Sequence, residues 1–273
     1  MAGSWPCSRS HGRRAGDALM RVVQITDAHL YADIEARSRA GIPWRQFQQV
    51  LNAVVAEKPD IVLFTGDISQ DESAASYALA MQALEQLPCP WYWLPGNHDQ
   101  PEFMAAERPM VEQVNLDSWR ILLLNTQVEG KPHGELGSER LAKLAEQLEN
   151  DDRPTLIAMH HPPVDVGAVW MDAIGLQDRD AFWQLLSKHP HVKIILFGHA
   201  HQAYAEHHIL GTGRGIGEAT IDVYGCPAMA DQFLPGAEQF AIDEASRPGY
   251  RVIDLAYSDA QGSEWQSWVE RID

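Results

Sequence analysis

The 273-residue sequence predicts an α/β fold, and three observations support that prediction. Apolar runs of strand-like composition alternate with segments of helical spacing in the order β-α-β-α-β, first over residues 21–94 and again over 119–197. Most of these runs end directly in polar residues, at the position where open α/β sheets bind their ligands. After residue 201 four further runs follow without helices between them, and we interpret them as a second sheet that closes the other face of the core.

The first alternation contains three strands and two helices. Phe47, Val50 and Val54 recur three or four residues apart, which predicts a helix over 44–58. Ser73 is the expected cap of the second helix, because a serine side chain can accept a hydrogen bond from the first turn. The strands are expected at 21–26, 60–65 and 90–94, and the second helix at 73–87.

The second alternation and the later runs follow the same reasoning. The strands are expected at 119–125, 155–159 and 192–197, and the helices at 138–149, with Ser138 as its cap, and at 178–188. The four later strands are expected at 204–210, 219–224, 250–257 and 264–271. Trp91 and Trp93 are expected in the core, because alternation along a strand buries one of its faces.

Five clusters of potential ligands share one feature, since each directly follows an apolar run. They are Asp27-Ala28-His29, Gly66-Asp67, Gly96-Asn97-His98-Asp99, His160-His161 and Gly198-His199-Ala200-His201. Together they supply two carboxylates, one amide and at least four imidazoles for a metal site. That number of oxygen and nitrogen donors is about what two divalent ions with a shared ligand require.

The spacing within these clusters suggests which side chains act together. Alternation in an extended chain places Asp27 and His29 on one side, so that both can reach one cation. It likewise aims the imidazoles of His199 and His201 the same way. The same alternation sends His160 and the following histidine to opposite sides. We therefore expect one of these two imidazoles, rather than both, to be a ligand.

The composition limits the partners and the compartment. The formal net charge of −17 argues against a nucleic-acid polymer or an anionic membrane, because both require a basic surface. The three cysteines form no C-x-x-C pair, which indicates reduced thiols and a cytoplasmic protein. Residues 1–19 are expected to be a disordered tail, with Met20 as an alternative start, and residues 20–273 to form a single domain.

The ordered motifs resemble those of the calcineurin-like metallophosphoesterases and, within them, the bacterial class III cyclic nucleotide phosphodiesterases. The resemblance extends from Arg21 to about Leu255. It rests on the five clusters and on the segments 24–27, 93–99, 132–136, 190–193 and 198–202. It implies a four-layer αββα sandwich, in which two mixed β-sheets are flanked by helices.

The resemblance also implies a site with two divalent metal ions, whether Mn, Fe or Zn. Asp27, His29 and His201 would bind the first ion. Asn97, His160 and His199 would bind the second ion, and Asp67 would bridge the two. The histidine at 160 matches the family position, and His161 would instead orient a neighbour or line the pocket.

The activity implied by the resemblance is hydrolysis of 3′,5′-cyclic AMP to 5′-AMP, by in-line attack of a metal-bridging hydroxide. His98 would donate a proton to the leaving oxygen, and Asn97 and His201 would contact the substrate with it. Asp71 or Asp99 would orient His98. The adenine would stack on Trp44 or on Trp170, both of which we expect in loops that face the ligand clusters.

Two other functions remain open from the sequence. A phosphodiesterase of broader specificity, acting on glycerophosphodiesters or 2′,3′-cyclic nucleotides, would carry the same five clusters. The second is a non-catalytic scaffold that has lost its metals. Such a protein should have lost some ligand residues, whereas every ligand position is intact here. The substrate partner is a small cyclic nucleotide in the favoured prediction, and a homodimer is left open.

Overall fold

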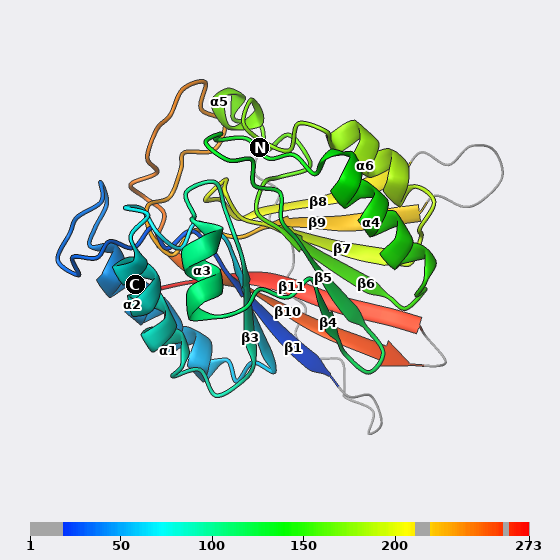
Figure 1. Ribbon diagram of the computed structural model, residues 1–273, viewed down its shortest axis with the longest axis horizontal. Coiled ribbons are helices and arrows are strands. Elements are labelled where there is room, and N and C mark those ends of the chain that lie inside the picture. Colours follow the sequence, from blue (N-terminus) through cyan, green and yellow to red (C-terminus); the bar gives the residue numbers. More distant parts are fainter. Residues whose placement is uncertain (1–18, 211–218, 259–261, 273) are drawn as a thin grey trace.

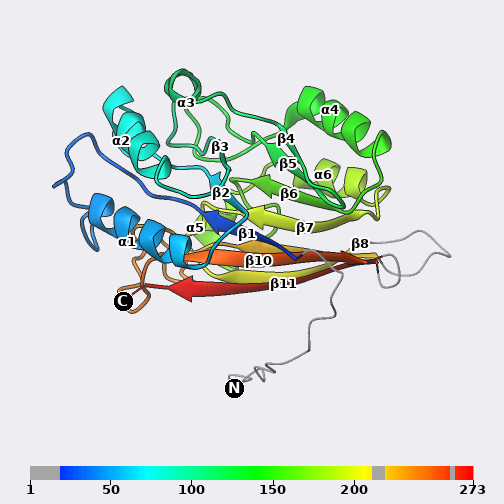
Figure 2. The same ribbon diagram turned by 90° about the horizontal axis from the view of Figure 1, so that it is seen from below.

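The protein is built from two mixed β-sheets that pack face to face, with helices on both outer faces (Figure 1). The computed structural model describes residues 19–210, 219–258 and 262–272. The expected disordered tail lies outside these residues except for Leu19. The predicted four-layer αββα architecture is confirmed, and Figure 1 shows α1 (Pro43–Ala56) and α4 (Gly137–Glu149) on opposite sides of the strands. Figure 2 shows β10 (Gly249–Ser258) and β11 (Gly262–Arg271) side by side at the lower edge.

The first sheet has the strand order β11-β10-β1-β2-β3. Strands β1 (Met20–Ile25), β2 (Ile61–Thr65) and β3 (Trp91–Leu94) are parallel, and β10 (Gly249–Ser258) and β11 (Gly262–Arg271) join them in antiparallel pairing. Helices α1 (Pro43–Ala56) and α2 (Ala74–Leu84) contribute to the apolar cluster on its outer face through Phe47 and Tyr77, among others. A short helix α3 (Pro101–Glu107) follows β3.

The second sheet has the strand order β4-β5-β6-β7-β9-β8. Its strands are β4 (Gln113–Asn115), β5 (Arg120–Leu124), β6 (Thr155–Met159), β7 (Val192–Phe197), β8 (Tyr204–Leu210) and β9 (Ala219–Gly225). Its outer face packs on α4 (Gly137–Glu149), α5 (Val169–Asp172) and α6 (Arg179–Leu186). The sequence analysis did not predict α3, β4 or α5, which are too short for a clear periodic signal.

A third apolar cluster lies between the sheets and joins strands from both. It includes Leu63 and Ile253 of the first sheet and Leu123, Leu156 and Ile194 of the second. Polar contacts cross the same interface near the ligand clusters. The Gln24 amide donates to the Phe197 carbonyl over 3.0 Å, so β1 and β7 are held in register where both strands end.

The prediction that the last four strands form a sheet of their own is wrong. Strand β9 pairs in parallel with β7, and β10 pairs with β1, so each sheet receives two of the four strands. The pattern of alternating residues gives strand positions but not their partners. Cys89 and Cys226 are free thiols, as expected, and none of the helices in the described ranges is long and apolar enough to cross a membrane.

The cap of α4 also differs from the prediction. The Ser138 side chain is exposed and caps nothing, whereas Ser73 caps α2 as expected by accepting from the Ser76 amide over 3.2 Å. At α4 the carboxylate of Asp178 accepts from the Gly137 amide over 2.8 Å and from the Leu136 amide. A side chain distant in sequence therefore replaces the local cap, and this link joins α4 to α6.

We expect Asp178→Ala to lower the free energy of unfolding by about 1 kcal/mol, because two amides at the start of α4 lose their acceptor. Ser138→Ala is the matched control and should leave the stability unchanged. Urea denaturation followed by circular dichroism measures both. Equal effects of the two substitutions would contradict the assignment of the cap.

Candidate metal centre

The five ligand clusters meet at one end of the two sheets, each at the carboxyl end of a parallel strand. Backbone hydrogen bonds continue between the clusters beyond the strands. The Asp27 amide donates to the Gly66 carbonyl over 3.0 Å, and the His29 amide donates to the Asp67 carbonyl over 3.0 Å. The Gly198 amide donates to the His160 carbonyl over 3.0 Å. The clusters are thus held together by backbone pairing before any ion is considered.

Most of the predicted ligands have a left-handed backbone. The φ angle is positive at Asp27, His29, Asp67, His199 and His201, with values from 47° to 62°. We expected an extended backbone at the triplets 27–29 and 199–201, and that expectation is therefore wrong. Non-glycine residues with positive φ are uncommon and concentrate at functional sites, where the surrounding structure holds the strain.

Two glycines allow the clusters to approach one another. A Cβ atom at Gly96 would overlap the Oδ1 atom of Asp67 and lie 2.5 Å from the Asp67 amide nitrogen. A Cβ atom at Gly198 would overlap the Thr26 hydroxyl and lie 2.9 Å from the Asp27 carboxylate. Any side chain at either position would push a predicted carboxylate ligand out of place.

The three predicted ligands of the first ion form one compact group. His201 Nε2 lies 3.1 Å from the Oδ1 atom of Asp27 and 3.1 Å from the Nε2 atom of His29. These three side chains are one of the groups that can hold a metal ion. Ligand atoms bound to one ion at about 2.1 Å are spaced by roughly 3 to 3.5 Å, so the observed spacing suits a shared cation.

The second group surrounds His160. Its Nε2 atom lies 3.2 Å from the Asn97 Oδ1 atom and 3.4 Å from the Asp67 Oδ2 atom. The rings of His160 and His199 have centroids 5.1 Å apart. The same Oδ2 atom of Asp67 is 3.7 Å from His29 Nε2, so this carboxylate lies between the two groups, as a bridging ligand requires.

The structure also brings His161 into the second group, contrary to the expectation that alternation would turn it away. The rings of His161 and His199 have centroids 4.7 Å apart, and the nitrogens of both lie within 4.8 Å of a His160 nitrogen. Its Nδ1 atom pairs with the Thr126 hydroxyl over 2.8 Å. Because β6 ends before the two histidines, the period of the strand no longer applies to them.

Buried nitrogen atoms without partners fit a cation at this position. Among the described residues, the Nε2 atoms of His161 and His199 are buried and make no hydrogen bond. His29 faces its group with its Nε2 atom, which lies 3.1 Å from His201 Nε2. Burial lowers the pKa of His29 to about 4 and that of His199 to about 3, so both imidazoles are neutral at pH 7. Neutral imidazoles with free lone pairs are the form that binds a metal ion.

The pKa of His160 is raised, in contrast to the pKa values of His29 and His199. Burial alone would lower its pKa, but the carboxylate of Asp67 outweighs burial and raises the pKa to about 9. His160 in turn contributes to a pKa of Asp67 well below its usual range, against the effect of burial. Without a metal ion, the charges of His160 and Asp67 stabilise each other. With a metal ion, both side chains would bind the ion instead.

Backbone carbonyls fix the orientation of two of these imidazoles. The Nδ1 atom of His160 is 2.7 Å from the Thr65 carbonyl oxygen, and that of His201 is 2.6 Å from the Asp231 carbonyl oxygen. A carbonyl acceptor on one ring nitrogen leaves the other nitrogen free to bind a metal ion. The ring of Phe233 also stacks on His201, with centroids 3.8 Å apart and planes 7° apart.

The sequence analysis missed Asp231 and Phe233 as supports of the site. They lie between β9 and β10, more than 25 residues after His201. No motif marks them, since a single Asp or Phe in a polar loop has no distinctive spacing. Only the three-dimensional structure places them beside the predicted ligand His201.

The side chain of His98 is half-buried, and its ring lies 5.1 Å from that of His29. The expectation that Asp71 or Asp99 orients it is wrong. The Asp99 carboxylate accepts from the amides of Ile68, Ser69 and Gly96, so it joins the loops after β2 and β3 instead. Asp71 accepts from the Ala32 amide over 2.7 Å.

A cavity of about 310 Å³ opens beside the first group. His29, His98 and His201 are part of its lining, together with Arg39 and Phe240. Neither Trp44 nor Trp170 lines it, and both lie in helices, so the expectation that they lie in loops facing the ligand clusters is wrong. Trp44 packs against Phe47 in α1, and Trp170 lies in α5 behind Phe240.

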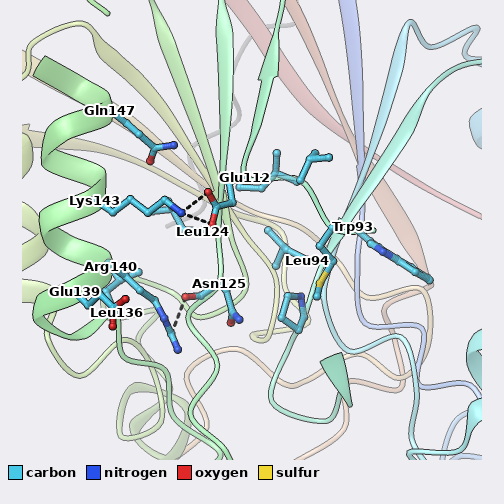
Figure 3. A pocket seen from close by; sticks show the side chains of 14 residues that line it. Trp93, Leu94, Glu112, Leu124, Asn125, Leu136, Glu139, Arg140, Lys143 and Gln147 are labelled. Carbon is cyan, nitrogen blue, oxygen red and sulfur yellow. Dashed lines mark hydrogen bonds and ion pairs between the residues drawn. The ribbon is translucent and has the colours of Figure 1, made fainter. Parts of the chain in front are cut away.

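A second cavity, of about 440 Å³, lies between β3, β5 and α4 (Figure 3). Its lining is largely apolar and includes Leu94 and Leu124, and the ion pair between Lys143 and Glu112, at 2.6 Å, lies within it. None of the predicted metal ligands lines this cavity. The smaller cavity is therefore the candidate substrate pocket.

The comparison with protein families agrees with this geometry. The family model for calcineurin-like phosphoesterases matches residues 20–203, which contain all five ligand clusters. The chain belongs to the calcineurin-like phosphoesterases. In this calcineurin-like phosphoesterase the matched segment ends just after His201, so the loop that carries Asp231 and Phe233 lies beyond it.

Curated relatives cover most of the chain. The 3′,5′-cyclic adenosine monophosphate phosphodiesterase CpdA of Vibrio vulnificus is 38% identical over 245 residues, which cover 86% of this chain and 85% of the relative. A probable cyclic nucleotide phosphodiesterase of Synechococcus sp. is 35% identical over 266 residues, 95% of each chain. A dimetal phosphatase from Danio rerio has a similar structure, with a TM-score of 0.63, 13% identity and coverage of 91% and 98%; this likeness concerns the fold alone.

We expect Gly96→Ala to abolish metal binding by this calcineurin-like phosphoesterase, because the added methyl group would displace the carboxylate of Asp67 from both groups. Gly130→Ala is the control: a Cβ atom there meets no atom within 4 Å, but the φ of +66° makes this variant less stable. It therefore shows how much metal is lost through lower stability alone. Metal content after reconstitution, measured by mass spectrometry, gives the result. Full metal content in the Gly96 variant would contradict the predicted role of Asp67.

We also expect metal binding to release a proton from His160, because its pKa of about 9 keeps it protonated at pH 7.5. His29 and His199 are already neutral and should release none. Metal affinity should therefore fall as the pH falls from 9 to 7. Calorimetric titrations in buffers of different ionisation enthalpy count the protons, and a release that is no larger at pH 7.5 than at pH 10 would contradict the assignment.

Proposed function

We propose that this protein hydrolyses 3′,5′-cyclic AMP to 5′-AMP at a centre of two divalent metal ions. The observation that supports it most directly is the arrangement of two ligand groups around one carboxylate, Asp67. Relatives that match across most of the chain are named as cyclic nucleotide phosphodiesterases. A scaffold without metals would not need seven intact ligand positions or the strained backbone that holds five of them.

The ligand set explains how an acidic protein could bind an anionic diester. Asp27 and Asp67 are the two carboxylates among the seven proposed ligands, so two divalent ions would keep a net positive charge. When bound, two such ions clamp a phosphoryl group, lower the pKa of water and offset charge on the entering and leaving oxygens. The local field at the site would then oppose the formal net charge of −17.

His98 has the position that a proton donor requires. It lines the cavity beside His29 and His201. Among the described residues, its side chain makes no hydrogen bond that would compete for the proton. Its backbone amide donates to the Asp67 Oδ1 atom over 2.9 Å, which fixes the residue relative to the bridging carboxylate. We infer that His98 protonates the 3′ oxygen of the ribose as the cyclic ester opens, with Asn97 and His201 in contact with the phosphate.

Three further parts of the proposal concern the surroundings. The substrate is a small molecule, and neither a nucleic-acid polymer nor a membrane is a partner, as the acidic composition suggests. The free thiols of Cys89 and Cys226 suit the cytoplasm. A homodimer stays a prediction that sedimentation equilibrium would test.

The test is hydrolysis of 3′,5′-cyclic AMP, 2′,3′-cyclic AMP and bis(p-nitrophenyl) phosphate after metals are stripped and Mn²⁺, Fe²⁺ or Zn²⁺ is restored one at a time. We expect metal-dependent release of 5′-AMP, with kcat/KM for 3′,5′-cyclic AMP equal to or above that for the other esters. Turnover of the other esters alone would support the broader phosphodiesterase. No turnover of any ester by folded protein would support the scaffold.

We expect His98→Ala to lower kcat for 3′,5′-cyclic AMP by roughly 10² to 10⁴, the range typical for loss of a general acid. Metal content should stay intact, because His98 is outside the proposed ligand set. Bis(p-nitrophenyl) phosphate has a better leaving group and should lose less. An unchanged kcat for cyclic AMP would remove His98 from the mechanism.

A further inference from the structure

The cavity beside the metal ligands has an aromatic wall that the proposed reaction does not use. Phe233, Phe240 and Trp170 pack edge to face, with centroids 5.2 Å apart in each pair. Phe233 and Phe240 line the cavity, and Trp170 lies behind them. One of the two lining rings, Phe233, is already covered by the imidazole of His201, which stacks on it.

Phe240 is different, because much of its ring is open to solvent. It is 43% exposed, although the side chain is large and apolar and lies at the edge of a cavity. Its position is fixed by the contacts with Phe233 and Trp170, so the exposed part of the ring is held in place rather than free to move. A rigid, exposed aromatic ring beside a ligand site suits a flat apolar group of the ligand.

Arg39 extends this surface. Its guanidinium carbon lies 4.8 Å from the centroid of the Phe240 ring, and its side chain also lines the cavity. Its backbone amide donates to the Asp231 carboxylate over 3.0 Å, and the same carboxylate accepts from Ser38 and Ala40. Among the described residues no ion pair involves the Arg39 side chain, so its planar cation remains available to a ligand.

The predicted ligands and this aromatic surface line one continuous cavity. His29, His98 and His201 line the same cavity of about 310 Å³ as Phe240 and Arg39. A cyclic nucleotide with its phosphate at the metal ligands would extend its ribose and base into the remaining space. Bases stack on aromatic rings and on arginine planes in nucleotide-binding sites of many folds.

We propose that Phe240 and Arg39 form the subsite for the nucleobase and set the preference for nucleotides over base-free phosphodiesters. This inference rests on the proposed function, because it takes a cyclic nucleotide as the substrate. Phe240 presents the apolar surface, and Arg39 presents a flat cation that stacks on the electron-rich base. The metal ligands act on the phosphate, which is common to all diesters, whereas these two side chains act on the base.

The experiment compares two substrates of the metal-loaded full-length protein, 3′,5′-cyclic AMP and the 3′,5′-cyclic phosphate of methyl riboside, which lacks the base. We expect Phe240→Ala to lower kcat/KM for cyclic AMP about 10-fold, mainly through KM, and to leave the base-free substrate within about twofold. Phe240→Tyr should restore most of the loss. Equal effects on the two substrates, or none on cyclic AMP, would overturn the proposal.

Two variants serve as controls. Phe103→Ala removes a phenylalanine that is 39% exposed on α3, outside the lining of the cavity. It should leave kcat/KM unchanged for both substrates. Arg39→Lys keeps the charge but removes the planar group. A loss confined to cyclic AMP in the Lys variant supports stacking on the base, and full activity in that variant would overturn the role given to Arg39.

A binding measurement separates this inference from the proposed function. Calorimetry compares 5′-AMP with ribose 5-phosphate on the metal-loaded protein, and we expect tighter binding of 5′-AMP that Phe240→Ala weakens about 10-fold. If cyclic AMP is not hydrolysed but this pattern holds, the proposed reaction fails and the base subsite stands. Equal affinity of the wild-type protein for the two ligands would overturn the subsite whatever the activity.

Discussion

The position of the Asp67 carboxylate is the constraint on which the rest of the site depends. Its Oδ2 atom lies 3.4 Å from His160 and 3.7 Å from His29, which belong to different sheets and to different ligand groups. Its Oδ1 atom accepts from the His98 amide, so the loop after β3 is placed relative to the same side chain. Moving this carboxylate would separate the two groups and shift the proposed proton donor with them.

Such an arrangement is unfavourable on its own, and hydrogen bonds and apolar packing elsewhere in the fold stabilise it. Left-handed backbone at five ligands costs of order 1 kcal/mol or more at each position, and the site also buries two carboxylates. The Asp99 carboxylate binds three amides of two loops, and Gln24 ties β1 to β7. Apolar clusters pack on both sides of each sheet, so the strand ends cannot move independently. A few polar contacts are therefore enough to hold the ligand clusters in place.

The sequence predicted the elements and the meeting of the five ligand clusters better than their geometry. Helices such as α1 and strands such as β2 follow from local periodicity, and the ligands follow from their place after apolar runs. The partners of β9 and β10 depend on long-range pairing, which periodicity does not encode. The left-handed turns at the ligands depend on neighbouring loops, and a triplet such as Asp27-Ala28-His29 carries no glycine to announce one.

The cavity wall and the predicted metal ligands come from different parts of the chain. The ligands lie at strand ends, whereas the wall is built by the long connections after β1 and β9, which Asp231 joins through Ser38, Arg39 and Ala40. The carbonyl of that same Asp231 holds His201, and Phe233 stacks on the His201 ring. The wall and the metal site therefore share a support. Changes at Asp231 or Phe233 would also act on the predicted ligand His201, whereas the Phe240 ring reaches His201 only through Phe233.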